Sequence, residues 1–332
     1  MIKIILLLTA INLLILLFFE NFSRIIGLYD RPDGIRKLHK RRIPNIGGFI
    51  FFGNLSVIVL YLNYFSTEDL NFFLEKKQLN LFYFFSTIFF ITGYLDDKFD
   101  LSANIKLILF IIIIIFFLYF FPDWVVKSLN FSFYKKSINI SNISYFFTIL
   151  SFLLFINAFN MFDGINLQSV SYSIFIVVFF FVTNNFNLFY IFLIFPLLIF
   201  FYLNYKNKCF MGDNGTLLVS FFFSFLFIDF HNNKKLLYAD EIFLIMLIPG
   251  LDLFRLFIER FIKRLHPFFP DRNHIHHLLV NKFGSNLSLV ILFSLIFLPN
   301  ILNQFYGITI FLILLSTFFY VYLITICKKN NL

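Results

Sequence analysis

The sequence is poor in cysteine and in charged residues. Two cysteines among 332 residues are too few for a disulfide framework, which excludes a small disulfide-stapled secreted module. Charged residues make up 14% of the chain, whereas soluble globular proteins carry about 25%. This shortage excludes an ordinary soluble domain. It equally excludes a disordered chain, because disorder depends on high charge and polarity.

Apolar side chains are correspondingly abundant. They make up 60% of the residues, with 58 phenylalanines alone, and the mean hydropathy is +0.86. A soluble protein is about 45–50% apolar. The composition therefore predicts an integral membrane protein.

Long apolar runs recur along the whole chain. A helix needs about 20 residues to cross the hydrocarbon core of a bilayer, so we expect an all-α polytopic membrane protein with about 10–11 transmembrane helices. The expected spans are residues 2–19, 46–66, 80–95, 106–121, 144–162, 168–183, 188–205, 216–230, 241–258, 287–304 and 306–326. We expect the third and eighth to be short. The first is predicted to be retained, because no small-residue cleavage site follows it.

Basic residues lie mainly on one side of these spans. Nineteen of the 27 Lys and Arg residues fall on the side that includes the C-terminal tail. By the positive-inside rule that side is cytoplasmic and the N-terminus lies outside. Five of the six histidines fall there too, which predicts an active site on the cytoplasmic face of a single membrane domain, residues 1–332. The expected catalytic loops are about residues 20–45, 96–106, 157–169, 205–215 and 255–286.

The first of these loops is densely cationic. Arg36, Lys37, His39 and Arg41 lie close together, shortly before Gly47-Gly48. Phosphate recognition needs cationic donors and a close approach of the backbone, and this stretch offers both. A positive-inside anchor explains the charges equally well, but not the histidine or the glycine pair. The net charge of +9 forms no continuous basic face, so we expect no nucleic-acid partner.

Acidic and amide residues recur at the ends of three spans. Asp96 and Asp97 are adjacent carboxylates, which a hard cation such as Mg²⁺ would stabilise, although a solvated helix cap is the simpler alternative. Asp213 lies between two glycines at an expected helix start. It could cap that helix, or it could bind a metal ion beside the helix N-terminus. At the end of the fifth span, polar residues recur every third position, which favours either a functional site or interhelical hydrogen bonds. They are Asn157, Asn160, Asp163 and Asn166.

The last loop holds three imidazoles within four residues. His274, His276 and His277 follow Asp271-Arg272. A zinc site is one interpretation, but cysteine partners and a His-Glu-x-x-His spacing are both missing. The other interpretations are charge stabilisation around a phosphate and a pH-dependent surface loop. Cations, acids and imidazoles on one face together indicate phosphoryl transfer, where catalysis is mostly positioning and charge stabilisation.

These groups occur in the order found in one enzyme family. The chain resembles the polyprenyl-phosphate N-acetylhexosamine-1-phosphate transferases, the WecA/MraY superfamily of glycosyltransferase family 4. The matching positions are Arg36, His39, Pro44, Gly47 and Gly48; Asp96, Asp97, Asp100 and Lys106; Asn157, Asn160, Asp163 and Gly164; Gly212, Asp213 and Gly215; and Asp271 to His277. The resemblance thus covers residues 36–277.

The resemblance implies an Mg²⁺-dependent phosphotransferase, with Mn²⁺ as an alternative ion. Undecaprenyl phosphate held in the bilayer would attack the β-phosphate of a UDP-N-acetylhexosamine. UMP would leave, and the lipid product would start a cell-envelope glycan such as an O-antigen. A bacterial plasma-membrane location is implied as well, and a homodimer is compatible with the family.

The resemblance also implies residue roles. The expected catalytic residues are Asp96, Asp97, Asp163, His274, His276 and His277. The expected substrate-binding residues are Arg36, Lys37, His39, Arg41, Lys106, Asn157, Asn166 and Arg272. The expected metal ligands are Asp213, Asn160 and Asp97.

Two details indicate the branch of the family. The peptidoglycan branch, which uses UDP-MurNAc-pentapeptide, typically reads Gly-Thr-Pro-Thr-Met-Gly-Gly where residues 42–48 read Arg-Ile-Pro-Asn-Ile-Gly-Gly. This loop and the final His-Ile-His-His resemble the WecA-like branch, which uses UDP-GlcNAc or its relatives. Asn166 stands where bacterial members usually carry Asp, which leaves its sugar or nucleotide contacts open. The alternatives are the peptidoglycan-precursor transferase and an ion-coupled transporter, which predicts inverted repeats that the sequence lacks.

Overall fold

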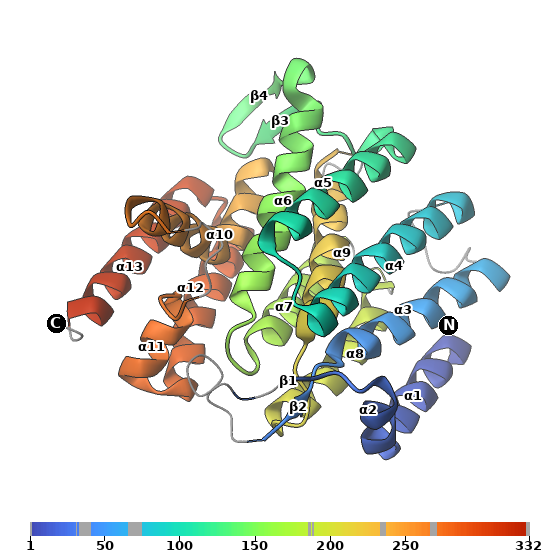
Figure 1. Cartoon of the computed structure of the whole chain (residues 1–332). Helices are drawn as coiled ribbons and strands as arrows, with labels where there is room; N and C mark the ends of the chain where they lie inside the picture. The colour runs from blue at the N-terminus through green and yellow to red at the C-terminus, as the bar shows by residue number, and fades with distance from the viewer. Residues whose placement is uncertain are drawn as a thin grey trace. The chain divides into compact units, whose positions relative to one another are not determined.

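The structure is a computed structural model that describes residues 2–30, 32, 41–65, 75–184, 187, 189–232, 237–265 and 271–329. Helices dominate it (Figure 1). They are α1 (Ile2–Leu17), α2 (Phe19–Ile26), α3 (Gly47–Tyr64), α4 (Lys76–Phe99), α5 (Ala103–Phe120), α6 (Ser144–Phe162), α7 (Gln168–Thr183), α8 (Phe189–Tyr205), α9 (Gly212–Asn232), α10 (Ala239–Ile262), α11 (Ile275–Phe283), α12 (Ser285–Tyr306) and α13 (Thr309–Lys329).

The strands form two small antiparallel pairs. Strand β1 (Tyr29–Asp30) pairs with β2 (Ile43–Pro44), and β3 (Ser128–Phe131) pairs with β4 (Tyr134–Asn139). Short 3₁₀ turns flank the second pair, at Pro122–Trp124 and Ser141–Ile143. Because these strands are so short, the expected all-α class is confirmed.

Each of the eleven expected spans coincides with a helix. Seven helices in the described ranges are long and apolar enough to cross a membrane, and α1 with α2 adds an eighth, bent by 78°. The expectation of short third and eighth spans is wrong, since α4 has 24 residues and α9 has 21. Their polar ends continue the helix, and hydropathy cannot detect this. The expected loop over 255–286 is also partly helical, because it contains the end of α10 and all of α11.

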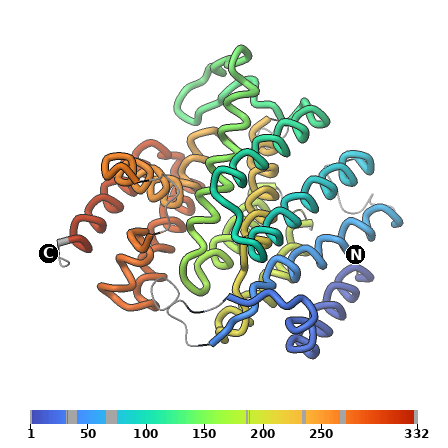
Figure 2. The backbone as a smooth tube through the Cα atoms, viewed as in Figure 1, coloured from blue at the N-terminus to red at the C-terminus, as the bar shows by residue number. Residues whose placement is uncertain are grey.

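Two compact units make up the chain. Unit 1 comprises Met1–Ile113 and Ser169–Phe223, and unit 2 comprises Ile114–Gln168 and Ser224–Leu332. In unit 1, α3 packs on α1, α4 and α8, and the tube view shows α1, α3 and α4 side by side (Figure 2). In unit 2, α10 packs on α6, α12 and α13, and α11 packs on α12 and α13.

Phenylalanine fills the helix contacts of unit 1. Phe90 of α4 stacks on Phe52 of α3 with ring centroids 4.3 Å apart. Phe89 of α4 stacks on Phe221 of α9 at 4.5 Å. Such pairs add about 0.5–1.5 kcal/mol each beyond the area they bury. This packing fixes α4 against the first half of α9.

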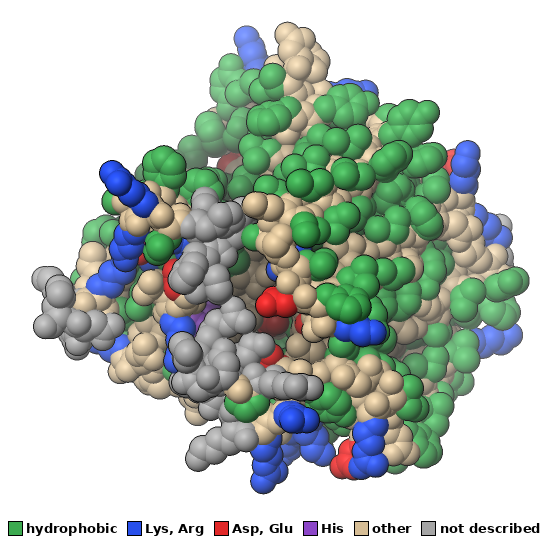
Figure 3. All heavy atoms as spheres, viewed as in Figure 1, with side chains coloured by type: hydrophobic (Ala, Val, Ile, Leu, Met, Phe, Trp, Pro, Cys, Tyr) green, Lys and Arg blue, Asp and Glu red, His purple; other side chains and the backbone are tan. Residues whose placement is uncertain are grey.

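Apolar side chains also cover much of the outer surface. Figure 3 shows many hydrophobic side chains on the face in view. Leu60 of α3 and Phe84 and Ile91 of α4 are exposed. The apolar window of α5 is only 22% buried, whereas that of α9 is entirely buried. Exposed apolar surface of this extent is typical of contact with lipid. The protein is therefore a multi-pass membrane protein.

Candidate active site

Two carboxylates and a lysine meet at the ends of three helices in unit 1. Asp96 lies near the end of α4, Lys106 near the start of α5, and Asp213 in the first turn of α9. The Lys106 ammonium lies 2.8 Å from Asp96 Oδ2, and the backbone N–H of Leu101 donates to Asp96 Oδ1 at 3.0 Å. The side chains of Asp96 and Asp213 are within hydrogen-bonding reach of each other. Two carboxylates this close repel unless a cation or a shared proton lies between them.

This pair of carboxylates fits a hard divalent cation. Mg²⁺ usually takes one or two protein carboxylates and completes its shell with water and substrate phosphates. Asp96 is 4% exposed, so a second negative charge beside it is costly without such a partner. Within the described ranges, no three His, Cys, Asp or Glu side chains form a ready-made metal cage. An ion shared between protein and substrate agrees with that arrangement.

The carboxylate of Asp97, the next residue of α4, accepts hydrogen bonds from a different set of donors. Its Oδ1 accepts from the Asn45 side chain at 3.2 Å and from the backbone N–H of Asp213 at 3.1 Å. Its Oδ2 accepts from the backbone N–H of Asn214 at 2.9 Å and from the amide of that side chain at 2.5 Å. A carboxylate offers about four acceptor sites, and four donors face it here. Asp97 therefore caps the start of α9, as an N-cap side chain would.

The role of Asp97 as a metal ligand, which the family resemblance implies, stays a prediction. Successive side chains on a helix point about 100° apart, so the two neighbours need not share a ligand. Asp96 faces Lys106 and Asp213, whereas the acceptor sites of Asp97 are filled by N–H groups. In the structure Asp97 thus caps the start of α9, whereas Asp96 lies beside Asp213.

The Gly47-Gly48 pair brings α3 close to the start of α9. The backbone N–H of Gly48 donates to the carbonyl oxygen of Met211 at 3.2 Å. A Cβ at Gly48 would overlap the Asn214 side chain and the backbone of Gly215. In the described structure this glycine pair thus serves helix packing, which holds the first turn of α9 in place.

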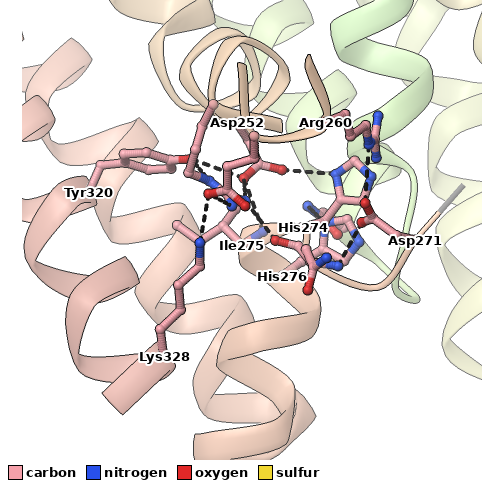
Figure 4. A network of polar contacts seen from close by, with 12 residues as sticks. Asp252, Arg260, Asp271, His274, Ile275, His276, Tyr320 and Lys328 are labelled. Carbon is pink, nitrogen blue, oxygen red and sulfur yellow. Dashed lines mark hydrogen bonds and ion pairs between the residues drawn. The ribbon is translucent and has the colours of Figure 1, made fainter. Parts of the chain in front are cut away.

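In unit 2 a buried carboxylate collects four donors (Figure 4). Asp252 of α10 accepts from His274 Nδ1 at 2.9 Å on Oδ2. Its Oδ1 accepts from Arg255 at 2.7 Å, from the Tyr320 hydroxyl at 3.0 Å and from the backbone N–H of Ile275 at 3.1 Å. Tyr320 belongs to α13 and Ile275 begins α11. One side chain therefore joins three helices.

Arg255 extends this network. Its guanidinium also donates to the Tyr320 hydroxyl at 2.9 Å, to Glu259 at 2.9 Å and to the carbonyl oxygen of Asn273 at 2.6 Å. Lys328 of α13 donates to the same Glu259 oxygen at 2.6 Å. The two basic side chains thus fix the end of α10 against the end of α13.

Asp271 and Arg272 begin the histidine motif. Arg260 donates to Asp271 at 3.1 Å, and the backbone N–H of Asn273 donates at 2.8 Å. Burial alone would raise the pKa of Asp271, but these two hydrogen bonds outweigh burial and lower it. Arg272 Nε is buried and has no hydrogen-bond partner among the described residues. Arg272 is therefore the cation in this motif with a donor to spare.

The three imidazoles contact one another at the start of α11, where His277 meets the other two rings edge-on. The His274 and His276 ring centroids lie 5.2 Å apart with nearly parallel planes, and those of His276 and His277 lie 4.3 Å apart. His276 is 1% exposed, and a Cβ at Gly164 would overlap its ring. The Gln168 amide lies 3.5 Å from His276 Nδ1. The end of α6 therefore packs directly on the histidine motif.

Burial keeps two of these imidazoles neutral. It lowers the pKa of His276 well below the usual value, and the neighbouring His277 lowers it further. Burial and then the Arg272 charge lower the pKa of His277 to about 4. At neutral pH both rings are uncharged in the unliganded protein, so they offer hydrogen bonds rather than charge.

The polar residues at the end of α6 lie in the same unit. Asn157 donates to the carbonyl oxygen of Leu153, one turn earlier, at 2.7 Å. Asp163 ends the helix and precedes Gly164, which packs on His276. Asn160 as a metal ligand, and Asn157, Asp163 and Asn166 at substrate, stay predictions.

Of the four basic residues predicted to bind substrate in the first loop, the structure describes one. Arg36, Lys37 and His39 lie outside the described residues. Arg41 is described and exposed. Its substrate-binding role stays a prediction.

Several residues that form hydrogen bonds to the carboxylates of the two clusters belong to none of the sequence motifs. Asn45 and Asn214 fix Asp97, and Arg255 and Tyr320 fix Asp252. A partial signal exists for α10, since Asp252, Arg255 and Glu259 recur at spacings of three and four residues and so share one helix face. Tyr320 has no local signal, because its partners lie 65 and 68 residues away.

Known proteins share this sequence pattern. The sequence profile described as glycosyl transferase family 4 matches residues 79–231. A Thermotoga maritima protein named undecaprenyl-phosphate α-N-acetylglucosaminyl 1-phosphate transferase is 26% identical over 315 residues, which is 94% of each chain. Proteins of the same name from Salmonella typhi and Escherichia coli (strain K12) are 28% and 27% identical, over 77% and 80% of this chain and 70% and 73% of their own length. Together with the ordered motifs, these matches show that the chain is similar to members of glycosyl transferase family 4.

Proposed function

We propose that this chain transfers N-acetylglucosamine 1-phosphate, or the 1-phosphate of a closely related N-acetylhexosamine, from a UDP-sugar to undecaprenyl phosphate. UMP is the second product. One structural observation carries the proposal: Asp96, Lys106 and Asp213 converge at the ends of three helices. The names of relatives that match nearly the whole chain support the choice of substrates.

The reaction moves a phosphoryl group between two oxygens. An oxygen of the lipid phosphate bonds to the β-phosphorus of the UDP-sugar. The bond from that phosphorus to the bridging oxygen of the α-phosphate breaks, and its electron pair leaves with UMP. Both reactants are anions, so catalysis depends on neutralising charge and on alignment.

The unit 1 cluster has the groups for this task. Asp213 and Asp96 would hold Mg²⁺, or Mn²⁺ in its place, and the bound ion would neutralise phosphoryl oxygens. Lys106 is paired with Asp96 and retains two further N–H donors for a phosphate. Asp97 keeps the first turn of α9 in place, and the positive end of the α9 dipole also favours an anion there.

The unit 2 cluster supplies a cation and ring nitrogens for hydrogen bonds. We assign Arg272 and the three histidines to phosphate oxygens of the substrates, because Arg272 has an unused buried nitrogen and His276 has another. Asn157, Asp163 and Asn166 are assigned to the nucleotide or sugar. Arg36, Lys37, His39 and Arg41 are assigned to substrate phosphate on their charge alone.

The proposed setting is the plasma membrane of a bacterium. The N-terminus would lie outside and the C-terminus in the cytoplasm, together with the site, because 19 of 27 basic residues fall on that side. A homodimer is proposed on family grounds only.

The test is UMP release by purified protein in detergent, given undecaprenyl phosphate, Mg²⁺ and a panel of UDP-sugars. The panel includes UDP-GlcNAc, UDP-GalNAc and UDP-MurNAc-pentapeptide. We expect release that requires both lipid and metal, highest with UDP-GlcNAc or a close relative. Asp213→Asn should lower it by at least about 100-fold, since it removes a metal ligand. Asp123→Asn, at an exposed carboxylate, is the matched control. No release from folded protein with any sugar overturns the proposal.

A further inference from the structure

Asp252 belongs to none of the motifs that indicate phosphoryl transfer, yet it lies at the centre of the unit 2 network (Figure 4). It is 4% exposed and accepts four hydrogen bonds. We propose that Asp252 is a positioning residue: it fixes His274 with a proton on Nδ1, so that the unprotonated Nε2 faces the substrate and can accept the proton of a phosphate hydroxyl. This inference rests on the proposed function for its substrate.

The tautomer follows from the chemistry of the contact. An ionised carboxylate has acceptor sites and no donor. His274 Nδ1 lies 2.9 Å from Asp252 Oδ2, so the imidazole must donate there. In the described part of the chain, Nε2 has no hydrogen-bond partner. That nitrogen remains for a ligand.

Hydrogen bonds also fix the orientation of the Asp252 carboxylate. Its Oδ1 is held from three directions, by Arg255 on the same helix, by Tyr320 on α13 and by the backbone N–H of Ile275. This leaves Oδ2 for His274 alone. Because Ile275 follows His274 directly, the same carboxylate fixes both the imidazole and the start of α11. Such outer contacts typically change ligand affinity or activity by about 10- to 100-fold when lost.

His274 differs in this respect from the ring stacked on it. His276 meets the Gln168 amide, whereas His274 meets a carboxylate. When Nε2 of His274 takes the proton of a phosphate hydroxyl of the lipid substrate, the phosphate gains a negative charge and the imidazolium that forms is balanced by Asp252. Of the two stacked rings, His274 is therefore the one suited to meet developing negative charge on a phosphoryl oxygen.

Kinetics separate positioning from simple support of the fold. In Asp252→Asn, the amide NH₂ facing His274 drives the imidazole proton from Nδ1 to Nε2. We expect kcat to fall by about 10- to 100-fold, with a smaller change in KM for the UDP-sugar. In a His274→Gln background, Asp252→Asn should lower kcat by less than about twofold, because the imidazole that Asp252 positions is absent. Equal losses in both backgrounds would show that Asp252 only supports the fold.

A spectroscopic measurement tests the tautomer without turnover. Ring ¹⁵N NMR of histidine-labelled protein should show one imidazole with Nδ1 protonated, and His274→Gln identifies its signal. Asp252→Asn should remove that signature, whereas Asp240→Asn should retain it. Asp240 is the matched control, because it is a buried carboxylate of the same helix that accepts from Ser132 instead. A His274 signal unchanged in Asp252→Asn overturns the inference, and this result is independent of whether UMP is released.

Discussion

Asn214 gives one oxygen of Asp97 two hydrogen bonds, from its backbone N–H at 2.9 Å and from its side-chain amide at 2.5 Å. The same amide also donates to the carbonyl oxygen of Asn45 at 2.9 Å. Asn214 is completely buried. Three motifs that lie far apart in the sequence are thereby joined, and the neighbouring Asp213 is brought to Asp96. The metal site we propose depends on this junction.

Removal of the Asp97 charge should loosen the first turn of α9. In Asp97→Asn, an NH₂ group replaces one acceptor oxygen and opposes the N–H donors that face it. We expect faster hydrogen–deuterium exchange in a peptide covering residues 211–217, and UMP release reduced by at least about 10-fold. Asp213→Asn, which keeps those backbone hydrogen bonds, should leave exchange near wild type. Lost activity with unchanged exchange in Asp97→Asn would contradict the capping role and favour Asp97 as a metal ligand.

Two glycines of α3 provide a matched test of helix packing. A Cβ at Gly48 would overlap Asn214 and the backbone of Gly215, whereas a Cβ at Gly53 meets nothing within 4 Å. Gly48→Ala should lower stability by about 1–3 kcal/mol and reduce turnover, because the start of α9 must move. Gly53→Ala should leave stability the same or slightly higher, since alanine favours the helix. Thermal unfolding in detergent and UMP release check both, and equal behaviour of the two variants would contradict the packing argument.

The Asp96–Lys106 pair predicts a separation of stability from activity. Lys106→Met leaves the buried Asp96 carboxylate without its cation, so we expect a loss of about 1–3 kcal/mol. Adding Asp96→Asn removes the uncompensated charge and should restore most of that stability, but not turnover. The measurement compares the unfolding midpoints of Lys106→Met and of the double variant. A double variant no more stable than Lys106→Met would show that the pair contributes little.

The histidine motif predicts a loss of stability in mild acid. The pKa of His277 is about 4 in the folded protein, below its ordinary 6.5, because of burial and then Arg272. Between these values the unfolded chain binds the proton and the folded chain does not, so stability is complete above about pH 6.5 and falls as the pH drops toward 4. The lowered pKa of His276 acts in the same direction. We expect the unfolding temperature to fall from pH 7 to pH 5, and to fall less in His277→Gln. Parallel curves for the two proteins would contradict this.

The sequence predicted the helices well, because each membrane crossing needs a long apolar run. It missed α2 and α11, which have 8 and 9 residues, because short amphipathic helices do not stand out by hydropathy. The lengths of α4 and α9 were underestimated because their polar ends are helical. These ends are where Asp96 and Asp213 lie.

The site was predicted as a set of residue types, but not as a set of contacts. Charge and spacing identified Asp96, Lys106, Asp213 and the histidines. The partner of Asp97 lies 117 residues away, and the contact between Asp252 and His274 spans 22 residues and two helices. Such contacts have no local pattern, because tertiary packing alone brings the side chains together. For this reason the sequence predicted neither the hydrogen bonds that hold Asp97 nor the contact between Asp252 and His274.

The most direct measurement follows the phosphorus atom. Purified protein would receive UDP-GlcNAc labelled with ³²P at the β-position, together with undecaprenyl phosphate and Mg²⁺, and the label would be counted in the organic phase after extraction. Transfer of the sugar with its phosphate predicts that the label enters the lipid in step with UMP release, and that Asp213→Asn abolishes both. Label that stays in the aqueous phase as UDP, while the sugar reaches the lipid, would contradict phosphotransfer.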